Sequence, residues 1–273
     1  MAVEARAREQ QLVKVMLSQN PLEKVGEFAR KGELHLPKKV GLIADGNGRW
    51  AESKGLTTTQ GHVQGGARVE EFFQHSEDLP GTTGAFAWLL SPDNVRGRSN
   101  EELAGIHGIV VDLTRRTGER LDKTGGKFIH LGSTEGLPNE ISDALSEEAQ
   151  RTQDNDGFQV GIGYLYDGDT TLVAGMRTAI KDLQGVDPDT RTDDELLEYL
   201  DPHGFGQVDM LIRTASDGDP HLSGLGRIAD RAQLHFPSTQ LPDFDELAYA
   251  EELVDFGNRE KRHGGRPAIN GQS

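Results

Sequence analysis

One short loop combines glycine, acidic, amide and basic residues in a way that suits an anionic ligand. The segment Asp45-Gly46-Asn47-Gly48-Arg49-Trp50 directly follows an apolar run over residues 40–44. Its glycines permit a tight turn and a close approach to a ligand, and a helix starting here would present free N–H groups to an anion. Arg49 supplies a guanidinium that matches phosphate oxygens. Asp45 would repel a bare diphosphate, so we expect a bridging Mg²⁺ ion.

The same residues also suit an ordinary turn between a strand and a helix, with Asp45 as the helix cap. The spacing alone leaves the ligand site and the turn equally open. The loop matches neither a Walker loop nor a GxGxxG fingerprint, so nucleotide binding is not indicated.

The elements that must position this loop are short apolar runs that alternate with helical patterns. The apolar runs cover residues 40–44, 84–90, 127–131, 158–166, 208–212 and 233–236. Helical patterns cover residues 66–78, 100–121, 139–151 and 170–183, whereas residues 184–194 read as a polar loop. This alternation predicts an α/β fold with an open, mainly parallel six-stranded sheet and helices on both faces. Ligands bind beyond the carboxyl ends of such strands, which is where the loop at Asp45 stands.

Composition excludes several classes of function. The net charge of −16, from 29 basic and 45 acidic residues, argues against a nucleic-acid partner, which requires a basic footprint. The absence of cysteine removes disulfides, thiolate metal sites and cysteine nucleophiles. No run approaches the roughly 20 apolar residues of a membrane helix, and the first residues lack the apolar core of a signal peptide. We therefore expect a cytoplasmic protein without an integral membrane segment.

Several motifs together resemble those of the cis-prenyltransferases, the family of undecaprenyl diphosphate synthase. The loop at residues 45–51, followed by Lys54-Gly55-Leu56 and Gly61-His62-Val63-Gln64-Gly65, is similar to the opening motif of that family in order and spacing. Further similar segments are Leu90-Ser91-Pro92-Asp93-Asn94, Asn155-Asp156-Gly157-Phe158, Tyr166-Asp167-Gly168, Asp209-Met210-Leu211-Ile212-Arg213-Thr214, Leu241-Pro242-Asp243-Phe244 and Arg262-His263-Gly264-Gly265. The resemblance spans about residues 37–265, expected to form the catalytic domain between a helical arm (1–36) and a flexible tail (266–273).

The resemblance implies a role for each matching position. Asp45 is expected to be the metal-linked catalytic carboxylate. The allylic diphosphate would be held by Gly46, Asn47, Gly48, Arg49 and Trp50. Catalytic assistance to ionisation or proton transfer would come from His62, Ser91 and Asn94. The second diphosphate would be held by Arg213, His221 and Ser223, with Arg262 and Gly264 closing over it. Family members are homodimers that use Mg²⁺, so both are expected here.

The chain also departs from the family pattern, mostly on the side of the second substrate. The usual arginine between Gly55 and Gly61 is absent, and the loop after Thr214 is two residues longer, with His221 in place of an arginine. A metal-linked glutamate is replaced by Gln233, which weakens the expected Mg²⁺ site because an amide carries no formal charge. Asp217 or Asp219 in the longer loop could substitute.

These observations predict a prenyltransferase that ionises an allylic diphosphate and couples it to a second prenyl unit. Because the departures fall on the acceptor side, we expect short-chain coupling, including irregular coupling, in specialised terpenoid metabolism. One alternative is prenylation or cyclisation of a substrate other than isopentenyl diphosphate. Another is a non-catalytic prenyltransferase subunit, although such subunits typically lose the first-loop aspartate that Asp45 retains.

Overall fold

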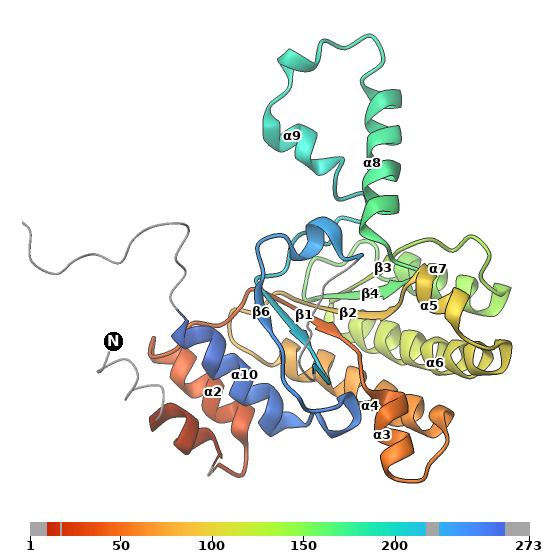
Figure 1. Ribbon diagram of the computed structural model, residues 1–273. Helices are drawn as coiled ribbons and strands as arrows, with labels where there is room; N and C mark the ends of the chain where they lie inside the picture. Colours follow the sequence, from red (N-terminus) through yellow and green to blue (C-terminus); the bar gives the residue numbers. More distant parts are fainter. Residues whose placement is uncertain (1–9, 17, 217–223, 260–273) are drawn as a thin grey trace, which may run out of the picture.

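A computed structural model of the protein describes residues 10–16, 18–216 and 224–259. Its core is one parallel sheet of six strands in the order β3-β4-β2-β1-β5-β6 (Figure 1). The strands are β1 (Lys39–Ile43), β2 (Gly84–Leu90), β3 (Lys127–Leu131), β4 (Gln159–Tyr164), β5 (Met210–Arg213) and β6 (Gln233–His235). The prediction of an open parallel six-stranded sheet is confirmed.

Helices link the strands. They are α2 (Pro21–Arg30), α3 (Asn47–Ser53), α4 (Thr58–Glu77), α5 (Pro92–Gly97), α6 (Asn100–Thr124), α7 (Asn139–Arg151), α8 (Gly168–Asp182), α9 (Asp193–Glu198) and α10 (Glu246–Asn258). The 3-10 turns within the described residues are η1 (Pro188–Thr190), η2 (Gly226–Ala229) and η3 (Leu241–Asp243). Among the described residues, no helix is both long enough and apolar enough to cross a membrane.

The two faces of the sheet are covered differently. On one face, strand residues such as Leu42, Ala87 and Ile162 pack into a large core with side chains of α2, α4, α6, α7 and α10. On the other face, Phe86 and Leu211 pack against Phe205 and against side chains of the η2 region. Helix α2 lies beside α10 (Figure 1), and the Leu22 backbone N–H donates to the Glu246 carboxylate over 3.0 Å. Of the helices in the first core, α4 packs against α3, which follows the Asp45 loop.

Several element boundaries differ from those expected from the sequence. Helix α4 begins at Thr58 rather than at residue 66, because Thr57 and Gln60 form a reciprocal capping box. The start of this helix was not predicted because it contains Gly61 and Gly65, and glycine is a weak helix former. Strand β4 ends at Tyr164 rather than at residue 166, because Leu165 turns out of the extended region with a φ of 50°. Helices α5, α9 and α10 had not been predicted.

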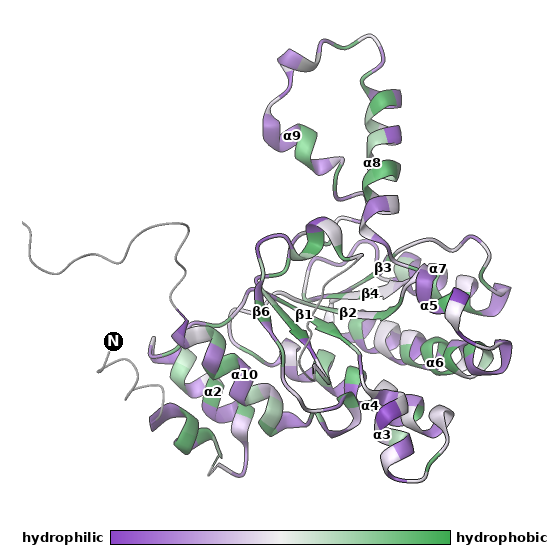
Figure 2. Ribbon diagram, viewed as in Figure 1, coloured by the Kyte–Doolittle hydropathy of each residue, from purple (hydrophilic) through white to green (hydrophobic). Residues whose placement is uncertain are grey.

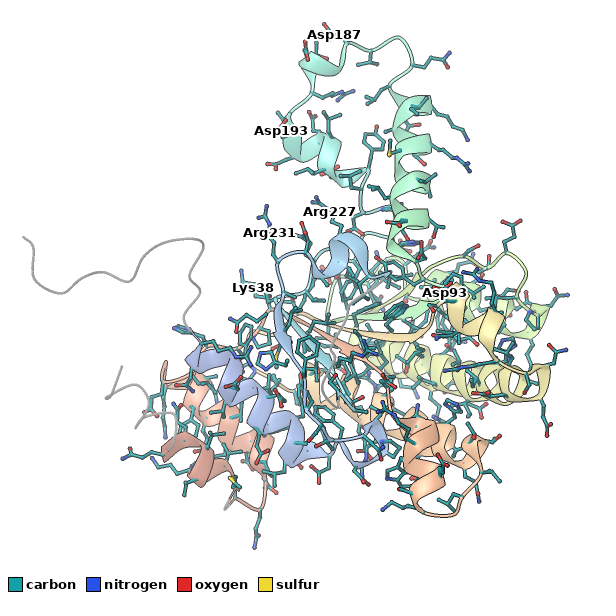
Figure 3. All side chains as sticks on the ribbon, viewed as in Figure 1. Lys38, Asp93, Asp187, Asp193, Arg227 and Arg231 are labelled. Carbon is teal, nitrogen blue, oxygen red and sulfur yellow. The ribbon has the colours of Figure 1, made fainter. Side chains whose placement is uncertain are left out.

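Helix α8 and the segment that runs through α9 stand away from the sheet (Figure 1). Hydrophobic residues lie along α8 (Figure 2), where the side chains of Met176 and Ile180 are 50% and 70% exposed. Figure 3 shows Asp187 and Asp193 in the outer part of this projection, away from Asp93 on α5. The segment expected to be a polar loop, residues 184–194, contains η1 and the first residues of α9.

Candidate active site

Asp45 occupies the centre of a charged cluster just beyond the carboxyl end of β1. One oxygen of its carboxylate, Oδ1, accepts from the Gly46 backbone N–H over 2.7 Å and lies 3.3 Å from Arg49 Nη2. The other, Oδ2, lies 3.0 Å from Arg213 Nη2. Arg213 ends β5, which pairs with β1, so the parallel register brings both side chains to one edge. Arg49, four residues after Asp45, and Arg213, distant in sequence, therefore both place a guanidinium group beside one carboxylate.

The backbone at Asp45 is fixed by Thr214, whose side chain is fully buried. The Thr214 hydroxyl donates to the Asp45 carbonyl oxygen over 2.7 Å, and the Asp45 N–H donates to that hydroxyl over 3.1 Å. One hydroxyl can fill both roles because it carries one hydrogen and two lone pairs. The β1 and β5 ends are therefore joined directly beneath the carboxylate.

Gly46 and Ala215 make a close backbone crossing beside this cluster. Gly46 has a φ of 100°, and a Cβ atom on it would lie 2.7 Å from the Cβ of Ala215. Ala215 itself has a φ of 56°, a conformation that costs an alanine about 1–2 kcal/mol. In this conformation its carbonyl oxygen accepts from Arg49 Nη2 over 3.1 Å. The crossing thus requires glycine at position 46 and helps to hold the Arg49 guanidinium near Asp45.

Asn47, the first residue of α3, lies against the glycines of α4. A Cβ atom on Gly61 would collide with the Asn47 carbonyl oxygen, and one on Gly65 would collide with the Asn47 side-chain oxygen. The Oδ1 atom of Asn47 is buried and, among the described residues, has no hydrogen-bond partner. The Gly61-to-Gly65 motif therefore exists in part to admit Asn47.

His62 lies between Asn47 and the acidic start of α6. Its Nδ1 is 3.4 Å from Asn47 Nδ2, and its Nε2 is 3.4 Å from Glu102 Oε1. Arg98 reaches the same Glu102 oxygen through Nε at 3.5 Å. Burial lowers the pKa of His62 below its ordinary value and the nearby Arg98 lowers it further, against the opposing effect of Glu102. The ring is thus held in its neutral form at neutral pH.

An apolar cavity of about 50 Å³ opens beside these polar groups. Three polar side chains, those of Asn47, His62 and Arg98, contribute to its lining. The remaining lining residues come from the β1 and β2 ends, α4, α6 and η3: Ala44, Gly66, Val69, Leu89, Ile106, Ile109, Val110, Leu113 and Leu241. The cavity is smaller than the roughly 150 Å³ of an engineered cavity that admits benzene.

Ser91 and Asn94 form the N-terminal cap of α5. The Asn94 backbone N–H donates to the Ser91 hydroxyl over 3.2 Å, and the Ser91 N–H donates to Asn94 Oδ1 over 3.1 Å. This reciprocal pairing is a capping box. Both side chains are thus engaged in local structure, and neither lines the apolar cavity.

Other residues expected in the site are placed elsewhere or are not described. Trp50 does not line the cavity, and its ring lies under Lys54 Nζ at 5.3 Å. A Cβ atom on Gly48 would meet only Thr58, at 3.8 Å, so the space beside it is open. His221, Ser223, Arg262, Gly264, Asp217 and Asp219 lie outside the described residues.

Gln233 stands far from Asp45 within one chain. Strand register aligns Gln233 with Met210 and Met210 with Val40, three positions before Ile43. That offset is about 10 Å along the strands, with two strand spacings of roughly 4.8 Å across them. Gln233 is therefore too far from Asp45 of the same chain for the two side chains to share an ion.

Sequence reasoning missed three residues that the structure brings into the site. Thr214 had been noted only as part of a motif, and neither Glu102 nor Arg98 had been given a role. The position of Thr214 immediately after Arg213, at the end of a strand adjacent to β1, was the signal that could have identified it. The contacts of Glu102 and Arg98 depend on how α4 and α6 pack, which no local pattern reveals.

Comparison with known proteins identifies the family. Residues 43–264 match the family model of undecaprenyl diphosphate synthases. An isoprenyl transferase of Streptomyces avermitilis is 31% identical over 252 residues, covering 87% of this chain and 94% of that protein. A ditrans,polycis-undecaprenyl-diphosphate synthase of Yersinia pseudotuberculosis is 28% identical over 239 residues, covering 85% and 92%.

A solved structure agrees with these matches. The crystal structure of lavandulyl diphosphate synthase from Lavandula x intermedia, in complex with dimethylallyl diphosphate, superposes with a TM-score of 0.73 at 26% identity. The match covers 82% of this chain and 97% of that one. Because the likeness extends from sequence to fold over most of the chain, the protein belongs to the cis-prenyltransferase family and is an enzyme that transfers prenyl groups.

Proposed function

We propose that Arg49 and Arg213 bind the diphosphate of an allylic substrate, with Asp45 beside it as a ligand of a bridging Mg²⁺ ion, and that the prenyl chain enters the cavity between α4 and α6. The guanidinium groups that contact Asp45 in the structure suit phosphate oxygens. The polar cluster and the apolar cavity are connected through Asn47, which lies two residues after Asp45 and contributes to the cavity lining. A charged head and an apolar tail thus each have a matching surface.

The reaction begins when the carbon–oxygen bond to the diphosphate breaks and both electrons leave on oxygen. The double bond of a second prenyl unit attacks the resulting allylic cation, which forms the new carbon–carbon bond and a second cation. Loss of one proton from that cation restores a double bond. Fixed positive charge beside the departing diphosphate is the largest contribution that the protein can make. The other sequence-predicted residues keep their proposed roles, with Ser91 and Asn94 assisting and His221, Ser223, Arg262 and Gly264 at the second diphosphate.

The residues at Asp45 also fit a Mg²⁺ ion. Proteins commonly hold Mg²⁺ through one or two carboxylates together with substrate phosphates, and Asp45 provides one half-buried carboxylate beside the proposed diphosphate. The ion would neutralise charge on the departing diphosphate. Asp45 would have to share or exchange its contacts with Arg49 and Arg213, which could then turn to the phosphate oxygens.

We further propose that the products are short. The cavity of about 50 Å³ has little room for a growing chain, and the similar synthase of lavandulyl diphosphate was solved with dimethylallyl diphosphate. Irregular coupling of two short units is consistent with that likeness. The missing arginine between Gly55 and Gly61 and the His221 found in place of another arginine are both changes at expected diphosphate ligands, and they agree with an altered acceptor.

The test is a product analysis. Purified protein is incubated with C5, C10 or C15 allylic diphosphates, each with and without isopentenyl diphosphate, in Mg²⁺ and in EDTA. We expect C10 or C15 products that require Mg²⁺. Long-chain products would contradict short-chain coupling, and product formed equally well in EDTA would contradict the metal role of Asp45.

We also propose a homodimer that uses the exposed apolar face of α8. Leu172, Val173, Met176 and Ile180 are between 38% and 70% exposed, and residues four apart share one side of a helix. An apolar row on a projecting helix is typical of an interface.

A charge at Ile180 (I180D) should shift the protein toward monomer in light scattering after size exclusion. The matched variant T178D, which adds the same charge elsewhere on α8, should remain dimeric, and equal behaviour of the two would contradict this interface.

A further inference from the structure

A chain of polar contacts runs along one side of the apolar cavity. It runs from Arg98 to Glu102 at 3.5 Å, from Glu102 to His62 at 3.4 Å, and from His62 to Asn47 at 3.4 Å. Such contacts are often long in the free enzyme and tighten when substrate is bound. Three of its four members also line the cavity, and Glu102 is the one that does not.

We propose that Glu102 is a positioning residue, which fixes the tautomer of His62 and thereby the direction of the Asn47 amide beside the cavity. The effect of Glu102 on catalysis rests on the proposed function. Its effect on the His62 tautomer and on the orientation of the Asn47 amide does not.

The direction of each hydrogen bond follows from the chemistry at the Glu102 end. An ionised carboxylate can only accept, so His62 Nε2 must carry the hydrogen. In a neutral imidazole the other nitrogen then offers a lone pair. Only the NH₂ group of Asn47 can donate to that lone pair, which turns Asn47 Oδ1 toward Gly65. Gly65 has no side chain to obstruct it there.

The groups that face His62 from each neighbouring element support a neutral ring. Arg98, between α5 and α6, lowers the pKa of His62, whereas Glu102 on α6 opposes it, and burial is the largest effect. Asn47 on α3 is uncharged. If the ring took up a proton, Nδ1 would carry a hydrogen that faces the Asn47 NH₂ group, and the amide would have to turn over.

This coupling has a consequence for an enzyme that passes through an allylic cation. A ring held neutral in one tautomer keeps the Asn47 amide in one orientation while charge develops beside it. The buried Oδ1 atom of Asn47, which has no hydrogen-bond partner among the described residues, then remains a fixed acceptor next to the cavity. Without Glu102 the ring would exchange between two tautomers and the amide between two orientations.

The test reads the tautomer directly. ¹⁵N NMR of protein labelled with [¹⁵N]histidine, with the His62 signals assigned by their loss in H62Q, should show the Nε2–H form in the wild type at pH 7.5. E102Q keeps the shape of the side chain but can donate as well as accept, so it should give a mixture of tautomers. The neighbouring exposed residue Glu101 provides the matched control, and E101Q should leave the wild-type signals unchanged.

Steady-state coupling complements the spectra. We expect E102Q to lower kcat by between about 10-fold and 100-fold without changing the thermal midpoint, and E101Q to retain wild-type kcat. An Nδ1–H tautomer in the wild type would overturn the proposal, and so would an unchanged tautomer in E102Q. If E102Q does not fold, the wild-type spectrum alone decides. A wild type without prenyl transfer would contradict the proposed function and leave the tautomer result standing.

Discussion

The two polar clusters of the site are built in opposite ways. Around Asp45, a carboxylate has two guanidinium neighbours and a backbone N–H, with the shortest contacts at 2.7 and 3.0 Å. Around His62, a neutral ring lies between an amide and a carboxylate, with both contacts at 3.4 Å. The first cluster is organised for a fixed charge, as a diphosphate requires. In the second cluster, the contacts decide which ring nitrogen of His62 carries the hydrogen. This suits a ring that must stay neutral beside an allylic cation.

The clusters also differ in where they come from. Asp45 and Arg213 end two paired strands, so the sheet alone brings them together. Glu102 is 40 residues from His62 in the sequence, and only the packing of α4 against α6 joins them. In this site, the strand ends place the charged groups Asp45 and Arg213, and the helices α4 and α6 place His62 and Glu102, which set the position of a hydrogen.

The largest effect should come from removing one guanidinium of the first cluster. R213Q removes one of the two guanidinium groups that contact Asp45 among the described residues, and with it a proposed phosphate ligand, so kcat/KM should fall by about 100-fold or more. The control is R231Q, because Arg231 is an exposed arginine near η2 (Figure 3) and its loss should leave kcat/KM unchanged. Similar values for the two variants would show that the Asp45 cluster has no special role in turnover.

A stability effect should reveal how the backbone holds the first cluster. G46A places a Cβ atom 2.7 Å from that of Ala215 at a φ of 100°, so the free energy of unfolding should fall by about 1–3 kcal/mol. G48A meets only Thr58 at 3.8 Å and should be neutral or slightly stabilising. Urea unfolding measures both variants, and equal stabilities would mean that the loop relaxes without cost.

The smallest effect should appear in the pH dependence of stability. The pKa of His62 is lowered in the folded state, so the unfolded chain binds the proton more readily. Stability therefore falls as the pH drops through the ordinary histidine value toward the lowered one, and the contribution vanishes at higher pH. H62Q should lose less stability than the wild type between pH 7.5 and pH 5.5. The same loss in both proteins would contradict a buried neutral ring.

The sequence predicted those features of the fold and of the site that depend on contiguous residues. Alternating apolar runs predicted the six strands and their parallel arrangement, and the loop at Asp45 was expected at a strand end. Boundaries were missed where local chemistry overrode hydrophobic pattern, as at the Thr57 cap of α4 and the positive φ of Leu165. The contact between Arg213 and Asp45 was not expected, because Arg213 had been interpreted as a ligand of the second diphosphate.

The central claim is that the Asp45 cluster ionises an allylic diphosphate, and release of inorganic diphosphate tests it most directly. Wild type and D45N are each mixed with dimethylallyl, geranyl or farnesyl diphosphate, with isopentenyl diphosphate or a second allylic diphosphate as acceptor. We predict one diphosphate released per bond formed by the wild type, and a rate at least about 100-fold lower for D45N with an unchanged thermal midpoint. Equal rates for the two proteins, or no release from any allylic substrate, would contradict the account.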